Sequence, residues 1–270
     1  MERLVIKMNK KTSVFSKLYV GLILLFLYAP IFVLIVFAFN KSKSRGTWSG
    51  FTFSWYEKFL QDERLIEALL VTIICGLLAA LIATVIGTLT ALAFYSMKKR
   101  KKSILISLAY IPMLNAEIVT GISLMMMYTL IKLELGFLTL LLSHVTFCIP
   151  YVILSIMPKM KQFDYSFYEA ALDLGATPGK ALRKIVLPDL MPGIISGFIL
   201  SFTLSIDDFI ISLFTTGNGV NNLSIEIYAM TKRGINPEIN AVSTIVFGAI
   251  LALLILINFK PHKKTKKEVF

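Results

Sequence analysis

The segment EAALDLGATPGKALRKIVLP, which runs from Glu169 to Pro188, is a polar interval in a chain that is otherwise mostly apolar. Its first six residues, Glu169–Leu174, are strong helix formers. Asp164 or Ser166 is placed to cap the start of this helix. Gly175 suits the left-handed residue that ends a helix. The sequence therefore predicts a short helix followed by a sharp turn.

A second short helix is predicted after this turn. Thr177 can cap it with Pro178 at its first position, and Pro188 is expected to end it. GATPGKA, Gly175–Ala181, resembles a phosphate-binding loop, but it has three residues between its glycines instead of four and lacks the final Ser or Thr. No nucleotide site is predicted here. Two interpretations remain, an amphipathic loop on the membrane surface and a docking element for another protein.

The rest of the chain has the composition of an integral membrane protein. The whole chain has 270 residues, of which 56% are hydrophobic, and its mean hydropathy is +0.76. A helix that crosses a bilayer needs about 20 apolar residues. Six stretches meet this requirement, and each must be helical to satisfy its backbone in lipid. They are Leu18–Phe39, Ala68–Tyr95, Ser103–Ile131, Phe137–Pro158, Met191–Thr216 and Ala241–Asn258.

The lysines and arginines are concentrated in every second loop and at both ends of the chain, and this distribution predicts the orientation of the chain in the membrane. Twenty of the 28 fall in the N-terminal segment, the loops after the second and fourth spans, and the tail. Both termini are therefore predicted to be cytoplasmic. The chain divides into a basic segment 1–17, a membrane domain 18–258 that contains the loop 159–190, and a basic tail 259–270. Because the net charge of +12 is distributed in these clusters, it indicates no nucleic-acid partner.

Two other groups of residues have structural explanations. The first outer loop carries six aromatic residues, which suit a membrane-interface belt or, alternatively, a docking surface. His144 and Cys148 are four residues apart, but two ligands do not make a metal site. We expect a buried histidine with a backbone partner, and we predict that Cys75 and Cys148 are buried thiols.

Three carboxylates lie within the predicted spans: Glu117, Asp207 and Asp208. A charge at the bilayer centre costs roughly 2.5–3.5 kcal/mol or more, so such residues usually face a cavity or a partner. Pro112 is expected to distort the third span just before Glu117. No lysine or arginine lies in the spans to neutralise these acids. A path for a cation is one interpretation; protonated acids, ion pairs to a partner subunit and acids at the outer rim are the others.

Helical spacing places polar residues of the fifth span on one face. Ser201, Ser205, Asp208 and Ser212 share this face, and Asp207 lies beside it. We expect this stripe to line the path.

The polar interval resembles the EAA loop of permeases in ATP-binding-cassette (ABC) importers. Its pattern is Glu-Ala-Ala, three residues, Gly, nine residues, Ile-x-Leu-Pro. Seven positions match: Glu169, Ala170, Ala171, Gly175, Ile185, Leu187 and Pro188. The resemblance implies an all-α, six-span permease of the MetI-like type I importer fold, whose short helix couples it to a cytosolic ATPase.

Further stretches are similar to polyamine permeases of this family, among them Thr203–Gly217, Gly234–Ile245 and Ser143–Tyr151. The resemblance implies import of spermidine or putrescine into a bacterial cell. Glu117, Asp207, Asp208, Ser205 and Glu238 would line the path. It also implies a second related permease, an ATPase dimer that holds ATP and Mg, and an external polyamine-binding protein. The chain itself would carry no cofactor and catalyse no reaction.

Two rival functions remain open. One is an ABC permease for another solute, and the other is an ion-coupled cation transporter that uses the intramembrane acids as a relay. An ion-coupled carrier has no need of a coupling loop.

The predicted orientation can be tested by cysteine labelling in intact cells. Lys99→Cys and a cysteine in the basic tail are expected to react with a membrane-impermeant maleimide only after the cytoplasmic side is opened, because the positive residues lie there. Labelling of either cysteine in sealed cells would overturn the orientation.

Overall fold

The structure is a computed structural model that describes residues 14–42, 47–234 and 237–258. Within these residues every element is a helix, apart from one isolated antiparallel bridge between Asn40 and Phe51. Most of the basic N-terminal segment and the whole basic tail lie outside the described residues. The chain forms two compact units, one from residues 63–229 and the other from residues 1–62 together with 230–270.

The smaller unit contains α2 (Val14–Phe37), α3 (Ser54–Gln61) and α13 (Glu238–Asn258), and both α2 and α3 pack against α13. The aromatic residues of the predicted first outer loop, some of which lie on α3, divide into two groups. Trp55 and Phe59 are buried, and the Trp55 indole donates a hydrogen bond of 2.7 Å to the carbonyl of Asn40. Trp48 and Phe51, in contrast, are exposed. Part of the predicted belt is thus the core of this unit.

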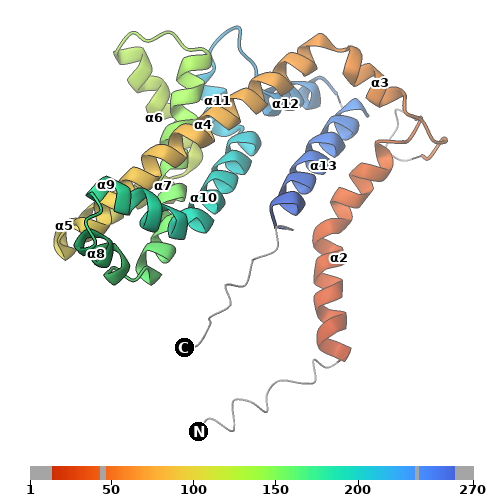
Figure 1. Cartoon of the computed structure of the whole chain (residues 1–270). Helices are drawn as coiled ribbons and strands as arrows, with labels where there is room; N and C mark the ends of the chain where they lie inside the picture. The colour runs from red at the N-terminus through yellow and green to blue at the C-terminus, as the bar shows by residue number, and fades with distance from the viewer. Residues whose placement is uncertain (1–13, 43–46, 235–236, 259–270) are drawn as a thin grey trace. The chain divides into compact units, whose positions relative to one another are not determined.

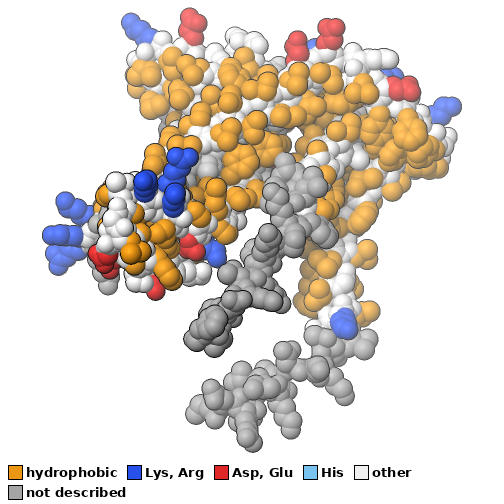
Figure 2. Space-filling model, in the orientation of Figure 1, with side chains coloured by type: hydrophobic (Ala, Val, Ile, Leu, Met, Phe, Trp, Pro, Cys, Tyr) orange, Lys and Arg blue, Asp and Glu red, His pale blue; other side chains and the backbone are white. Residues whose placement is uncertain are grey.

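The larger unit is built on three long helices, α4, α7 and α10, which pack against one another (Figure 1). Two helix pairs and a short helical hairpin complete it. The elements are α4 (Glu63–Ser96), α5 (Lys99–Leu114), α6 (Glu117–Leu130), α7 (Phe137–Gln162), α8 (Ser166–Asp173), α9 (Pro178–Ala181), the π-helix η2 (Leu182–Val186), α10 (Leu187–Asp207), α11 (Ile210–Thr215) and α12 (Leu223–Arg233), the last of which ends in the smaller unit. Hydrophobic side chains cover the flank of this unit, while lysines and arginines gather where α5, α8 and α9 lie (Figure 2).

Small residues let the three central helices approach closely. A Cβ atom added at Gly87 of α4 would lie 2.7 Å from the Val152 side chain of α7. At Gly193 of α10 it would lie 3.0 Å from the carbonyl oxygen of Ser155, and at Gly197 it would lie 3.2 Å from the Val152 Cα. Such contacts drive association of membrane helices, because lipid supplies no hydrophobic force between them.

The apolar helices agree with the predicted spans. Four are long and apolar enough to cross a bilayer, and a fifth is present if one bent pair counts as a single span. They are Ser16–Phe37, Glu63–Phe94, Phe137–Gln162, Pro178–Asp207 and the bent pair Arg100–Leu114 with Glu117–Leu130. The sixth predicted span coincides with α13, in which Glu238–Ala252 forms a shorter apolar helix. Cys75 and Cys148 are buried free thiols, as predicted.

Two predicted spans are broken, one at a distortion that the sequence predicted and one where it predicted a continuous helix. The third bends by 101° between α5 and α6, just after Pro112, where a turn was expected to open. The fifth stops at Asp207, and α11 begins at Ile210 after extended backbone at Asp208. This second break has no proline or glycine to signal it.

The prediction that Pro188 ends the second helix of the loop is wrong. The helix continues from Pro178 to Asp207 through the π-turn η2, in which the amide of Leu187 bonds to the carbonyl of Leu182. Pro188 lies in the first turn of α10, directly after this turn. A proline inside a helix removes one hydrogen bond and crowds the carbonyl four residues earlier, and the wider π-turn accommodates it.

The close approach of α7 and α10 can be tested by enlarging Gly193. We expect Gly193→Leu to destabilise the folded protein by about 1–3 kcal/mol, because a larger side chain meets backbone atoms of α7. Thermal stability in detergent, followed by size-exclusion chromatography, measures the loss. Gly21→Leu is the matched control, since among the described residues no atom outside its own stretch of helix lies within 4 Å of a Cβ there. Equal stability of both variants would contradict the packing argument.

Candidate functional site

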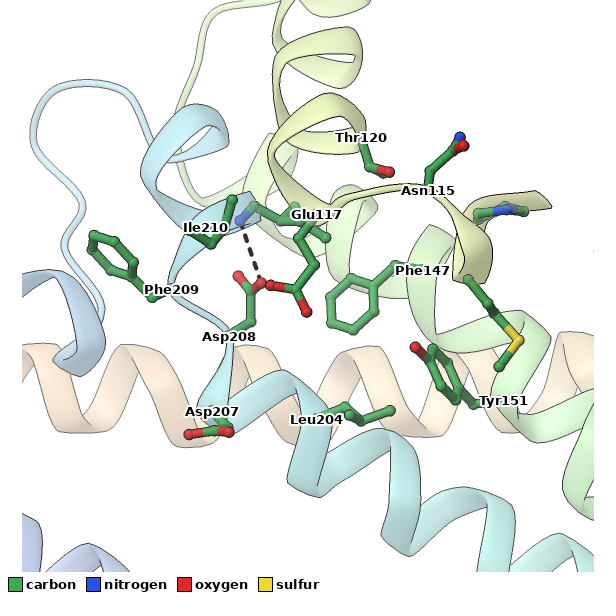
Figure 3. Close-up of a pocket in the computed structure, with 13 residues that line it drawn as sticks. Asn115, Glu117, Thr120, Phe147, Tyr151, Leu204, Asp207, Asp208, Phe209 and Ile210 are labelled. Atoms are coloured by element: carbon green, nitrogen blue, oxygen red, sulfur yellow. Dashed lines mark hydrogen bonds between the residues drawn. The ribbon is translucent and has the colours of Figure 1, made fainter. Parts of the chain in front are cut away.

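The two helix breaks meet at a pocket in the larger unit. Its volume is about 260 Å³. The chain around the α5–α6 break and the chain around the α10–α11 break both contribute to its wall, and α6 packs against α11. The lining residues are Pro112, Met113, Asn115, Glu117, Thr120, Phe147, Tyr151, Leu204, Asp207, Asp208, Phe209, Ile210 and Ile211. The breaks therefore place polar side chains and aromatic rings around one cavity (Figure 3).

All three predicted intramembrane carboxylates line this pocket. Glu117 is the first residue of α6, where the positive end of the helix dipole favours a carboxylate. In Figure 3 the side chains of Glu117 and Asp208 extend into the same part of the pocket, whereas the Asp207 carboxylate points away from them. No lysine or arginine occurs among the described residues that line the pocket. The wall is thus anionic and aromatic.

The three carboxylates differ in exposure. Glu117 and Asp207 are exposed, whereas Asp208 is only 9% exposed. The Asp208 carboxylate accepts hydrogen bonds from the backbone amides of Ile211 and Ser212, at 3.3 Å and 2.8 Å. It thereby caps the first turn of α11, whose amides have no partner within the helix. Glu117 and Asp207 remain as the acids whose carboxylates face open space.

A cluster of buried polar side chains surrounds Asp208, and the sequence analysis missed it. His144 of α7 lies with its Nε2 atom 2.9 Å from the Ser212 hydroxyl and 3.5 Å from an Asp208 carboxylate oxygen, while its Nδ1 atom bonds to Ser205. Asn222 also donates to the Ser212 hydroxyl, at 2.7 Å. His144 is buried, as expected, but its partners are side chains and not the backbone. The only local signal was a histidine in an apolar helix.

Two further residues that were predicted to line the path, Ser205 and Glu238, are not among the residues that line this pocket. Ser205 is buried and bonded to His144, and it does not line the pocket. Ser201, Ser205 and Ser212 are all fully buried, so this face of the fifth span packs inside the unit. Glu238 begins α13 in the smaller unit and is 8% exposed.

The start of α8 and the turn between α8 and α9 fold as their local chemistry predicts. Asp164 accepts a hydrogen bond of 3.0 Å from the amide of Ser166 at the start of α8, and this bond lowers the Asp164 pKa because it stabilises the charged carboxylate. Gly175 has a φ of +82°. The amide of Ala176 bonds to the Ala171 carbonyl at 3.0 Å, which forms the hydrogen-bond pattern of a glycine-terminated helix. Thr177 caps the next helix, as predicted, with Pro178 at its start.

The α8 helix is exposed or half-buried along its length, and one of its side chains contacts the core. None of its residues is buried, and Phe167 and Leu174 are 62% and 89% exposed. Tyr168 packs against the hydrophobic core formed by α4, α7 and α10. These exposed apolar side chains suit both predicted roles of the segment, an amphipathic loop on the membrane surface and a docking element for another protein.

Comparison with known proteins places these features in a family. Residues 83–259 match the model of the binding-protein-dependent transport system inner membrane component. The chain is 40% identical over 241 residues to the spermidine/putrescine transport system permease protein PotC of Escherichia coli K12, covering 89% of this chain and 91% of that protein. It is 36% identical over 232 residues to the putrescine transport system permease protein PotI of the same organism, covering 83% of each.

Solved structures agree in fold. A bacterial ABC transporter involved in the import of the acidic polysaccharide alginate contains a chain that matches with a TM-score of 0.70 at 19% identity, over 95% of this chain and 96% of that chain. The MetNI methionine ABC transporter matches with a TM-score of 0.58 at 16% identity, over 72% and 92%. With a family match over residues 83–259 and 40% identity to PotC over 89% of its length, this chain belongs to the family of inner membrane components of binding-protein-dependent ABC importers.

Proposed function

We propose that this chain is the permease subunit through which spermidine or putrescine enters the bacterial cytoplasm. The observation that carries the proposal is the 40% identity to PotC over nine-tenths of both chains. Polyamines are linear aliphatic cations, and the pocket supplies the groups that bind such molecules. Carboxylates pair with ammonium groups, and aromatic faces attract cations.

Glu117 and Asp207 are the residues that we assign to substrate contact. Both are exposed at the pocket, and neither is engaged by a lysine or arginine of the pocket wall. Phe147, Tyr151 and Phe209 contribute the aromatic surface. Import of another solute by the same machinery is the remaining rival, and an anionic pocket disfavours acidic or neutral solutes.

Membership of the family implies an ATPase and an external binding protein as partners. We further propose that α8 docks on one copy of an ATPase dimer, and that a second related permease completes the substrate path. In this arrangement the loop 159–190 and both termini are cytoplasmic. The exposed Leu174 and Phe167 side chains are suited to fill a groove on the ATPase.

Uptake of radiolabelled spermidine and putrescine tests the substrate. Cells with the full set of partners are expected to accumulate label only when this chain is present. We expect Glu117→Gln and Asp207→Asn each to raise the apparent KM roughly tenfold or more, since a hydrogen bond to a charged group contributes about 1.5–3 kcal/mol. Glu134→Gln, an exposed acid that does not line the pocket, is the matched control. Equal uptake by cells with and without this chain would exclude polyamine import through it.

The coupling role of α8 is tested at Gly175. We expect Gly175→Val to weaken the end of α8, because a β-branched residue is strained at a φ of +82°. Less ATPase should then co-purify with the permease, and uptake should fall while the amount of permease in the membrane is unchanged. Gly179→Val is the control, since Gly179 lies nearby, has open space around it and has no such φ. Equal co-purification by the two variants would remove α8 as the docking element.

A further inference from the structure

The hydrogens around Ser212 can be assigned from its partners. A hydroxyl group has one proton to donate and two lone pairs that accept. The Ser212 hydroxyl donates to the Asp208 carboxylate at 2.7 Å. Its other two neighbours, the His144 Nε2 atom and the Asn222 side-chain amide, must therefore donate to it. This assignment gives His144 a hydrogen on Nε2 and uses the one proton and both lone pairs of the Ser212 hydroxyl.

The same cluster joins four helices. His144 comes from α7, and Asp208 with Ser212 comes from the break and α11. The side-chain oxygen Oδ1 of Asn222 accepts from the amide of Ile225 at 2.9 Å and so caps α12. The amide of Leu223, the residue directly after Asn222, donates to the Thr72 hydroxyl of α4 at 2.8 Å. The α10–α11 break is thus held by His144 of α7 and by Asn222 at the start of α12, and α12 is in turn bonded to α4.

The position of the Asp208 carboxylate depends on these partners. One carboxylate oxygen of Asp208 accepts from both the amide and the hydroxyl of Ser212, and His144 lies 3.5 Å from that same oxygen. A carboxylate with such partners caps a helix and cannot move to contact a cation in the pocket. The adjacent residue, Asp207, has the opposite environment because the chain turns between them.

We propose that His144 is a positioning residue for substrate passage, which acts through Ser212 and Asp208 to fix the α10–α11 break and thereby the placement of Asp207 at the pocket. His144 does not line the pocket, but its ring lies against that of Phe147, which does. The inference rests on the proposed function only where it concerns substrate. The structural part concerns the cap of α11 and requires no substrate.

Hydrogen exchange in the assembled transporter tests the structural part. His144→Leu and Ser212→Ala should speed exchange of the amides at the start of α11 by roughly fivefold, the effect of a weakened helix cap. Ser143→Ala is the matched control. Ser143 lies on the same helix as His144, and its substitution removes a buried hydrogen bond to Tyr128 of α6, outside this cluster. Unchanged exchange in α11 for both test variants would overturn the inference, whatever the substrate proves to be.

Uptake kinetics test the functional part. In proteoliposomes with all partners, His144→Leu should raise the apparent KM for spermidine roughly tenfold, as for residues that act through another residue. His144→Gln keeps a donor near the Ser212 hydroxyl and should recover most of the affinity. A lower amount of folded complex with an unchanged KM would show a purely structural role and overturn the proposal. If the wild-type complex imports neither polyamine, the proposed function fails, while the exchange experiment still decides the cap.

Discussion

The cap that Asp208 provides for α11 is the interaction on which the pocket depends. A helix that breaks inside a bilayer exposes backbone amides where no water can bond to them, and each costs several kcal/mol if unsatisfied. Asp208 accepts two of these amides, and His144 and Ser212 in turn stabilise its buried charge. Because the break is satisfied within the protein, α11 can turn away from α10 and pack against α6. Gly121 permits this contact, since a Cβ there would lie 3.0 Å from Phe214.

Neighbouring acids in one sequence can therefore have different functions. Asp207 and Asp208 are adjacent, and the sequence treats them as one anionic stripe. A continuous helix would have kept them about 100° apart on its surface, both at the edge of the same face. The break separates them into a buried cap and an exposed carboxylate. An intramembrane acid thus indicates either a binding group or a structural anchor, and burial together with hydrogen-bond partners distinguishes the two.

The sequence predicted those features whose causes are local. Apolar length determined the spans, and caps and glycine conformation determined the α8–α9 turn, since each depends on a few adjacent residues. The α5–α6 bend was partly foreseen because Pro112 is itself a local signal. The α10–α11 break was not foreseen, because its stabilising partner, His144, lies more than sixty residues away in the chain. The same distance hid the inward orientation of Ser205, which helical periodicity places on a polar face but cannot assign to a neighbour.

The helix that was expected to end at Pro188 joins the α8–α9 turn, to which we assign docking of the ATPase, and the pocket, to which we assign substrate contact. One helical run of 30 residues extends from Pro178, at the α8–α9 turn, to Asp207 at the pocket. At 1.5 Å per residue such a helix is about 45 Å long. A displacement of α9 would therefore reach the pocket with no intervening loop to absorb it. The π-turn at Leu182–Val186 lies close to the α9 end of this run, and its altered bonding makes it the natural point of bending. Beyond it, α10 packs against α7 through Gly193 and Gly197, and it also packs against α4, so the pocket half of the helix must move together with those neighbours or not at all.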